Sequence, residues 1–283
     1  MKRATWWLLA ALVLAGCASP LRGTASPGQL VAQSVQATST AKTAHVDYTR
    51  TRTYVLPVDY PWPPATLGMP PHTYKLDLTG SGDLAFPDRF HYMVTLRLGP
   101  NFHTQIELIS IQGVAYEQDG VHVDFGGTVT PTWSKRNPQN LLPVDPFQTL
   151  QSLKDTLPPR DLGDMTIGGT RVHHYAMDMD PTKLVARETA TLADPSLQPA
   201  LQDAIGQGTF HVEVWIGTDD HLIRRISALE KRSETIALLR AEGNLGPTPT
   251  ASNQGVVAMS DQFVLNLHDF NRPVAITVPL NVR

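Results

Sequence analysis

The sequence predicts an α+β fold in which a strongly curved antiparallel sheet, a half-barrel, wraps around a few short helices. Segments of alternating apolar and polar residues follow one another through most of the chain, as in a meander of antiparallel strands. Helix-start signals occur only in three separate groups. A single sheet of so many strands must twist and curl, so its concave face needs an apolar filling. We expect the helices to supply it.

The N-terminus predicts export and attachment to a membrane. A basic start, Met1-Lys2-Arg3, precedes the apolar run Trp6–Val13 and then Leu14-Ala15-Gly16-Cys17. The apolar run is shorter than the roughly 20 residues that cross a bilayer. The tetrapeptide resembles the lipobox of bacterial lipoproteins, in which the cysteine is lipidated and becomes the first mature residue. The expected organisation is a signal peptide over residues 1–16, a tether over 17–25 after lipidated Cys17, and one half-barrel domain over 26–283.

The alternative for this segment is an ordinary secretory signal followed by a chance cysteine. The chain's only cysteine falls at the position that the lipobox requires, which favours lipidation. Two acyl chains give stable anchoring, so we expect a lipid-anchored protein on the exported side of the cell membrane or envelope. With one cysteine no internal disulfide can form, and a net charge of −3 gives no reason to expect nucleic acid as a partner.

The first half of the mature chain is predicted to be one helix followed by strands. Ser26, Pro27 and Gln29 form a capping-box start for a helix to about Ala41. The expected strands are Ala44–Leu56, Thr73–Leu78, Arg89–Leu98, His103–Gln112, Gly113–Gln118 and Val121–Phe125. The proline-rich stretch Pro57–Pro71 is expected to be a surface loop, and turns are expected at Gly80–Asp83, Gly99–Asn101 and Asp119-Gly120.

The second half begins with a polar stretch, Trp133–Pro143, and then alternates short helices with strands. Three Asp-Pro pairs begin the helical groups, at Asp145, Asp180 and Asp194. The expected strands are Ile167–Met179 with an internal Gly168-Gly169 turn, Phe210–Ile216, Leu222–Leu229 and Met259–Leu267. The segment Glu234–Glu242 is ambiguous between strand and helix, and Gly246–Gly255 is expected to be a loop.

No catalytic motif with its own chemistry occurs in the chain. The nucleophile elbow, the HExxH zinc motif, the glycine-rich phosphate loop and paired cysteines are all missing from the sequence. His173 and His174 are adjacent, so on a strand they point to opposite faces. His211, Glu213 and Trp215 share one strand face, for which a solvated outer surface is favoured over a zinc site. Arg224-Arg225 is interpreted as a strand charge pair rather than a lipid-phosphate site.

The layout of the chain resembles the LppX/LprG-type lipoproteins of the LolA-like superfamily of lipoprotein and lipid carriers. The resemblance rests on turns and strand ends rather than on a catalytic signature. Its cues are Ile106–Tyr116, Trp133, Asp145-Pro146-Phe147, His173-His174-Tyr175, Val214-Trp215-Ile216, Leu222–Arg225, Leu267–Phe270 and Pro273-Val274. The resemblance implies a hydrophobic cavity that accepts the acyl chains of a lipid or lipoglycan. The Pro57–Pro71 stretch departs from the pattern and is expected to alter the cavity mouth.

The sequence therefore predicts a non-enzymatic, membrane-anchored protein that binds a lipid or other amphiphile for transport or sensing, without a cofactor or metal. For any single inward-facing apolar residue, packing in the hydrophobic core is the favoured role. Taken together, these residues are candidates to line a cavity. The candidate lining residues are Phe90, Tyr92, Val94, Leu96, Phe210, Val212, Val214, Ile216, Phe263 and Leu265. Two alternatives stay open: a regulatory or scaffold lipoprotein that binds a protein partner, and a hydrolase with a non-standard site.

Overall fold

The computed structural model describes residues 25–58, 60, 68–119, 132–136, 145–192, 194–241, 255–280 and 282. Several expectations fall outside these residues. They are the signal peptide, Cys17 and nearly all of the tether, most of the proline-rich loop, the strand at Val121–Phe125 and most of the loop at Gly246–Gly255.

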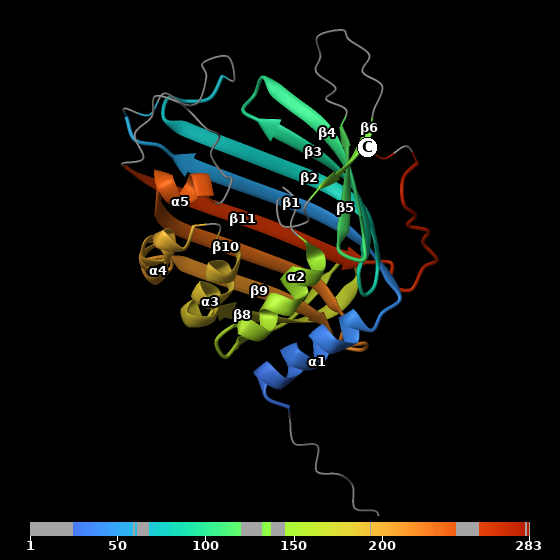
Figure 1. The fold of residues 1–283 in the computed structure, drawn as a ribbon. Helices are drawn as coiled ribbons and strands as arrows, with labels where there is room; N and C mark the ends of the chain where they lie inside the picture. Colours follow the sequence, from blue (N-terminus) through green and yellow to red (C-terminus); the bar gives the residue numbers. More distant parts are fainter. Residues whose placement is uncertain are drawn as a thin grey trace, which may run out of the picture.

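The described residues form one open, eleven-stranded antiparallel sheet in the order β6-β5-β4-β3-β2-β1-β11-β10-β9-β8-β7. Two meanders, β1–β6 and β7–β11, join where the first strand pairs with the last. Figure 1 shows β5 and β6 turned across the direction of the central strands, so the sheet forms a half-barrel. The strands are β1 (Thr43–Val55), β2 (Thr73–Ala85), β3 (Arg89–Leu98), β4 (Phe102–Ile111), β5 (Val114–Asp119), β6 (Thr132–Arg136), β7 (Arg160–Ile167), β8 (Thr170–Asp178), β9 (Thr209–Gly217), β10 (Ile223–Thr235) and β11 (Val256–His268).

Four helical segments, α1, α2, α3 and η4, begin at the caps that the sequence indicates. Ser26 Oγ accepts from the Gln29 amide at 3.3 Å while Gln29 Oε1 accepts from the Ser26 amide at 2.8 Å, which completes the predicted capping box. Asp145, Asp180 and Asp194 accept from backbone amides at the starts of α2, α3 and η4. The elements are α1 (Pro27–Ser39), α2 (Pro146–Ser152), η3 (Leu153–Asp155), α3 (Pro181–Thr191), η4 (Pro195–Leu197), α4 (Gln198–Gly206) and α5 (Ile236–Ala241).

The helices cover the concave face of the sheet, as the sequence predicts. Figure 1 shows α2, α3 and α4 over the half of the sheet that contains β8–β10. Leu150 and Leu153 belong to the main core cluster together with inward residues of β1–β4 and β8–β11. A smaller cluster joins Leu184 of α3 to Leu201 and Ile205 of α4. The apolar filling is therefore helical.

One local expectation was wrong, and the structure assigns two segments that the sequence left open. Gly80–Asp83 is not a turn, because β2 continues through it to Ala85. A Cβ on Gly82 would lie 1.9 Å from the His91 carbonyl oxygen, so glycine here permits the close approach of β3 in a curved sheet. The polar stretch after Thr132 contributes strand β6. Within the ambiguous segment, β10 ends at Thr235 and the short helix α5 follows.

Candidate functional site

A pocket of about 130 Å³ lies between the concave face of the sheet and the helices α2, η3 and α3. Phe210, Val212 and Phe263 supply apolar surface from the sheet, and Leu153 and Leu184 supply it from the helices. The remaining lining residues are Arg50, Thr149, Ser152, Met179, Arg187, Glu188, His211, Ile226, Ala228, Leu229, Glu230 and Asp261. The pocket is therefore apolar over much of its wall and charged at one end.

The charged end is part of a band of charged side chains that crosses the concave face. The central residue is Asp261 of β11, whose side chain is only 4% exposed. Arg50 Nε donates to Asp261 Oδ1 at 2.8 Å, and Arg52 Nε donates to Asp261 Oδ2 at 2.8 Å. Burial raises the pKa of Asp261, and Arg52 opposes this shift by stabilising the carboxylate. One carboxylate thus binds two largely buried guanidinium groups.

The second centre of the charged band is Arg232 of β10, whose side chain is 6% exposed. Arg232 pairs with Glu188 of α3 at 2.7 Å, with Glu230 at 2.9 Å, and with Glu234. Three carboxylates thus share one guanidinium group. The Glu230 side chain lines the pocket and is 27% exposed, and desolvation by burial raises its pKa to about 7.

Arg187 is an exposed cation at the border of the pocket. It lies on α3, next to Glu188. Among the described residues Arg187 has no ion-pair partner, unlike the guanidinium groups of the charged band. The pocket can therefore accept an apolar chain against its wall while a polar group meets charged side chains at its end.

Ser152 and His211, two lining residues of the types found in nucleophile–base pairs, each have partners of their own. Ser152 Oγ donates to the Thr149 carbonyl at 2.8 Å. His211 Nδ1 lies 2.9 Å from Asp178 and its Nε2 lies 3.3 Å from Glu213, both on the opposite face of the sheet. Neither side chain is placed to activate the other.

The ten predicted lining residues all lie on the concave face, but only three of them border the pocket. These three are Phe210, Val212 and Phe263. The other seven, Phe90, Tyr92, Val94, Leu96, Val214, Ile216 and Leu265, are buried in the main core cluster. Their contact with a ligand stays a prediction. The charged band was missed, although alternation from Phe263 back to Asp261, and from Tyr48 on to Arg50, places these side chains on the same inner face.

The histidines of β8 and β9 lie as strand alternation predicts. His173 faces Asp161 at 2.8 Å, while His174 faces Glu213 at 2.9 Å on the other side of the sheet. The outer face is not fully solvated, because Trp215 is only 7% exposed there. Trp215 stacks on His174 with ring centroids 4.3 Å apart, and Arg225 lies 5.5 Å from the indole. Arg224 pairs with Asp220, in agreement with the predicted structural role of Arg224-Arg225.

In the part of the chain that the structure describes, no helix is long and apolar enough to span a membrane. No family model matches the chain, and no curated protein matches it at the significance required.

Solved structures with similar folds include LprF from Mycobacterium bovis, 15% identical, with 90% of this chain and 99% of that chain covered and a TM-score of 0.42. They also include lipoprotein LppX from Mycobacterium tuberculosis, 15% identical, with 88% and 98% covered and a TM-score of 0.39. A DUF1329 family protein from Desulfovibrio piger is 9% identical, with 89% and 96% covered and a TM-score of 0.28. LppX represents the lipoprotein type that the sequence resembles, and the likeness concerns the fold alone.

Proposed function

We propose that this protein is an envelope lipoprotein, anchored through lipidated Cys17, that binds an amphiphile with an acyl tail. The observation that supports the proposal is the two-part pocket. Phe210, Val212 and Phe263 offer apolar surface to a tail, and Glu230 and Asp261 lie where the polar head would be. Burial of the tail supplies the affinity, at about 25 cal/mol per Å² of apolar surface removed from water.

The pocket size limits how a ligand enters. Pockets for small molecules typically measure about 300–1,000 Å³, whereas this one measures about 130 Å³. It therefore admits only the end of a tail unless α2 and α3 move away from the sheet. In such a movement Leu153 and Leu184 would lose their apolar contacts with the sheet. The ligand tail would then make apolar contacts with the same sheet surface. We infer that binding opens the helical layer, as expected for a protein that carries or senses a lipid.

A substitution in the pocket floor tests this function. Ala228 lies on β10 with its side chain in the pocket, and its neighbour Ser227 points to the outer face. In titrations with a dansyl-labelled fatty acid, Ala228→Phe should weaken binding at least tenfold because its ring occupies the tail site. Ser227→Phe adds the same ring to the same strand on the opposite face, and should bind as the wild type does. The proposal fails if the wild type shows no saturable binding, or if Ala228→Phe binds equally well.

A protein-binding role is the second candidate. It is favoured by the close packing of Leu150 and Leu153 into the concave face, which leaves little open volume. This role predicts that the protein shows no saturable binding of the dansyl probe. It also predicts that crosslinking followed by purification yields one envelope protein in stoichiometric amount. Ester and phosphoester substrates, screened on the same preparation, test the hydrolase alternative, and we expect no turnover.

A further inference from the structure

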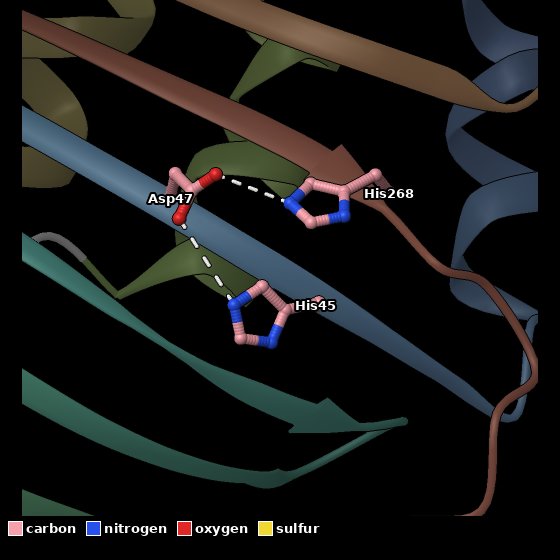
Figure 2. Close-up of side chains that lie close together, drawn as sticks. All are labelled: His45, Asp47 and His268. Carbon is pink, nitrogen blue, oxygen red and sulfur yellow. Dashed lines mark hydrogen bonds and ion pairs between the residues drawn. The ribbon is translucent and has the colours of Figure 1, made fainter.

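Two histidines and an aspartate meet on the convex face, on the side of the sheet opposite the pocket. His45 and Asp47 lie on β1, where they alternate with the buried residues Val46 and Tyr48 and therefore point outwards. His268 is the last residue of β11 and is the direct cross-strand partner of His45. Figure 2 shows Asp47 to one side of the two imidazole rings, with a dashed line to each.

The three side chains present their ligand atoms to a common point. His268 Nε2 lies 3.1 Å from Asp47 Oδ2, and His45 Nε2 lies 4.0 Å from Asp47 Oδ1. One ligand atom from each residue lies within 4.8 Å of the others. A tetrahedral zinc ion with bonds of about 2.0–2.2 Å holds its ligand atoms about 3.4 Å apart. Side-chain rotations that close the gap by about an ångström therefore complete a three-ligand set.

Additional carboxylates lie behind both imidazole rings. His45 Nδ1 lies 2.7 Å from Asp83 Oδ1, and a hydrogen bond donated there makes Nε2 the nitrogen available to a metal ion. His268 Nδ1 lies 3.5 Å from Asp269 Oδ2. Histidine ligands of metals almost always donate their other ring N–H to such an acceptor, which fixes the tautomer and raises the basicity of the ligand nitrogen.

The local charge also favours a cation. The carboxylates of Asp47, Asp83 and Asp269 lie around the two rings, and among the described residues Arg272 pairs with one of them, Asp269, at 2.6 Å. One contact must give way, because Ser81 Oγ lies 2.8 Å from His45 Nε2. Ser81 is a small hydroxyl side chain that can rotate to release this nitrogen.

We propose that His45, Asp47 and His268 bind one divalent transition-metal ion of the zinc type, with water in the remaining position. Two imidazoles and one carboxylate suit zinc, whereas calcium and magnesium prefer oxygen ligands throughout. Sharing of a carboxylate by two imidazoles is not by itself the distinguishing feature, because His174 and His211 on this face share Glu213 at 2.9 and 3.3 Å. The proposed site differs in its geometry. Among the described residues, His45, Asp47 and His268 form the group in which one ligand atom from each residue lies within 4.8 Å of the others.

The ion would connect β1, the first strand in the sequence, to β11, the last. Asp47 and His268 are 221 residues apart in sequence and come from the strands whose pairing unites the two meanders. The unfolded chain does not hold these ligands together, so the ion binds the native state. Free ion at 100 times its dissociation constant would then shift the folding equilibrium about 100-fold towards the native state.

The test is zinc binding to the full untagged chain in a Cys17→Ser background, which removes the only thiol. Isothermal titration with Zn²⁺ after chelator treatment should show one saturable site, and the ion should raise the melting temperature. Asp47→Asn and His268→Gln should each weaken this site at least tenfold, and Asp83→Asn about tenfold through the lost support of His45. The matched control His211→Gln removes an exposed histidine from the same face and should leave binding unchanged.

Circular dichroism of each variant without zinc separates lost binding from lost folding. A Co²⁺-substituted sample should show the intense visible absorption of a tetrahedral ion in the wild type and not in His268→Gln. The proposal is overturned if wild-type protein binds no zinc with saturation, or if Asp47→Asn and His268→Gln bind zinc as tightly as the wild type. Weakening by His211→Gln to the same extent would also contradict it, because binding would then be spread over the surface histidines.

Discussion

Replacing Glu230 with glutamine should remove a pH dependence of stability that the charged band creates. The pKa of Glu230 is raised from 4.5 to about 7 in the folded protein, chiefly because burial disfavours the carboxylate. Between these two values the native state holds a proton that the unfolded chain has lost. The free energy of unfolding that Glu230 contributes is therefore fully present below pH 4.5 and is lost as the pH rises through about 7.

The size of the effect follows from this interval. At about 1.4 kcal/mol per pH unit, a rise from 4.5 to about 7 corresponds to on the order of 3 kcal/mol. This is an upper figure because the side chain is 27% exposed. Glutamine is uncharged and nearly the same shape as protonated glutamate, so Glu230→Gln should match the wild type at low pH and exceed it once the carboxylate ionises.

Urea unfolding of wild type and Glu230→Gln at pH 4.5 and pH 8 measures this difference directly. The two midpoints should nearly coincide at pH 4.5, which serves as the internal control for packing. At pH 8 Glu230→Gln should be more stable by up to about 3 kcal/mol. An equal difference at both pH values, or a less stable Glu230→Gln at pH 8, would refute the inference that Glu230 is desolvated.

Three further substitutions test the packing around the site by the same unfolding assay. Arg232→Met leaves Glu188, Glu230 and Glu234 without their shared cation and should cost about 3–5 kcal/mol at pH 8, and less at pH 5. An equal cost at the two pH values would be inconsistent with stranded carboxylates. Gly82→Ala places a Cβ against the His91 backbone and should cost about 3 kcal/mol, whereas Gly163→Ala, which meets nothing within 4 Å but has φ +91, should cost less. Tyr92→Phe should be neutral or stabilising by up to about 1 kcal/mol, since the buried Tyr92 hydroxyl has no hydrogen-bond partner among the described residues. A loss above 1 kcal/mol would show that the hydroxyl has a partner in the native protein.

Strand alternation predicted much of the fold because each strand has one face against the core. Phe90, Tyr92, Val94 and Leu96 are all buried on the inner face of β3, as their spacing indicates. The same rule could not identify Gly80 and Gly82 as strand residues. Glycine pairs signal turns in most contexts, and only the close approach of β3 in a curled sheet explains them here.

The candidate site was only partly predictable. Inward positions were recognised by their apolar character, so the charged residues Arg50, Glu230 and Asp261 were not assigned to the pocket. They are buried because they neutralise one another across three strands, which requires knowing that β1 and β10 both pair with β11. The proposed metal site depends on the same pairing. Nothing local in the sequence places His268 opposite His45.

The central claim is that the concave face holds the tail of an amphiphile, and native mass spectrometry tests it most directly. The full chain is made in a lipid-competent bacterial host, purified, and compared with Ala228→Phe and Ser227→Phe from the same host. We predict that the wild type and Ser227→Phe retain one non-covalent lipid-sized mass, in addition to the proposed covalent lipid at Cys17. Organic extraction should release this mass, and Ala228→Phe should lack it. Wild-type protein without any bound lipid, or equal retention by Ala228→Phe, would contradict the claim.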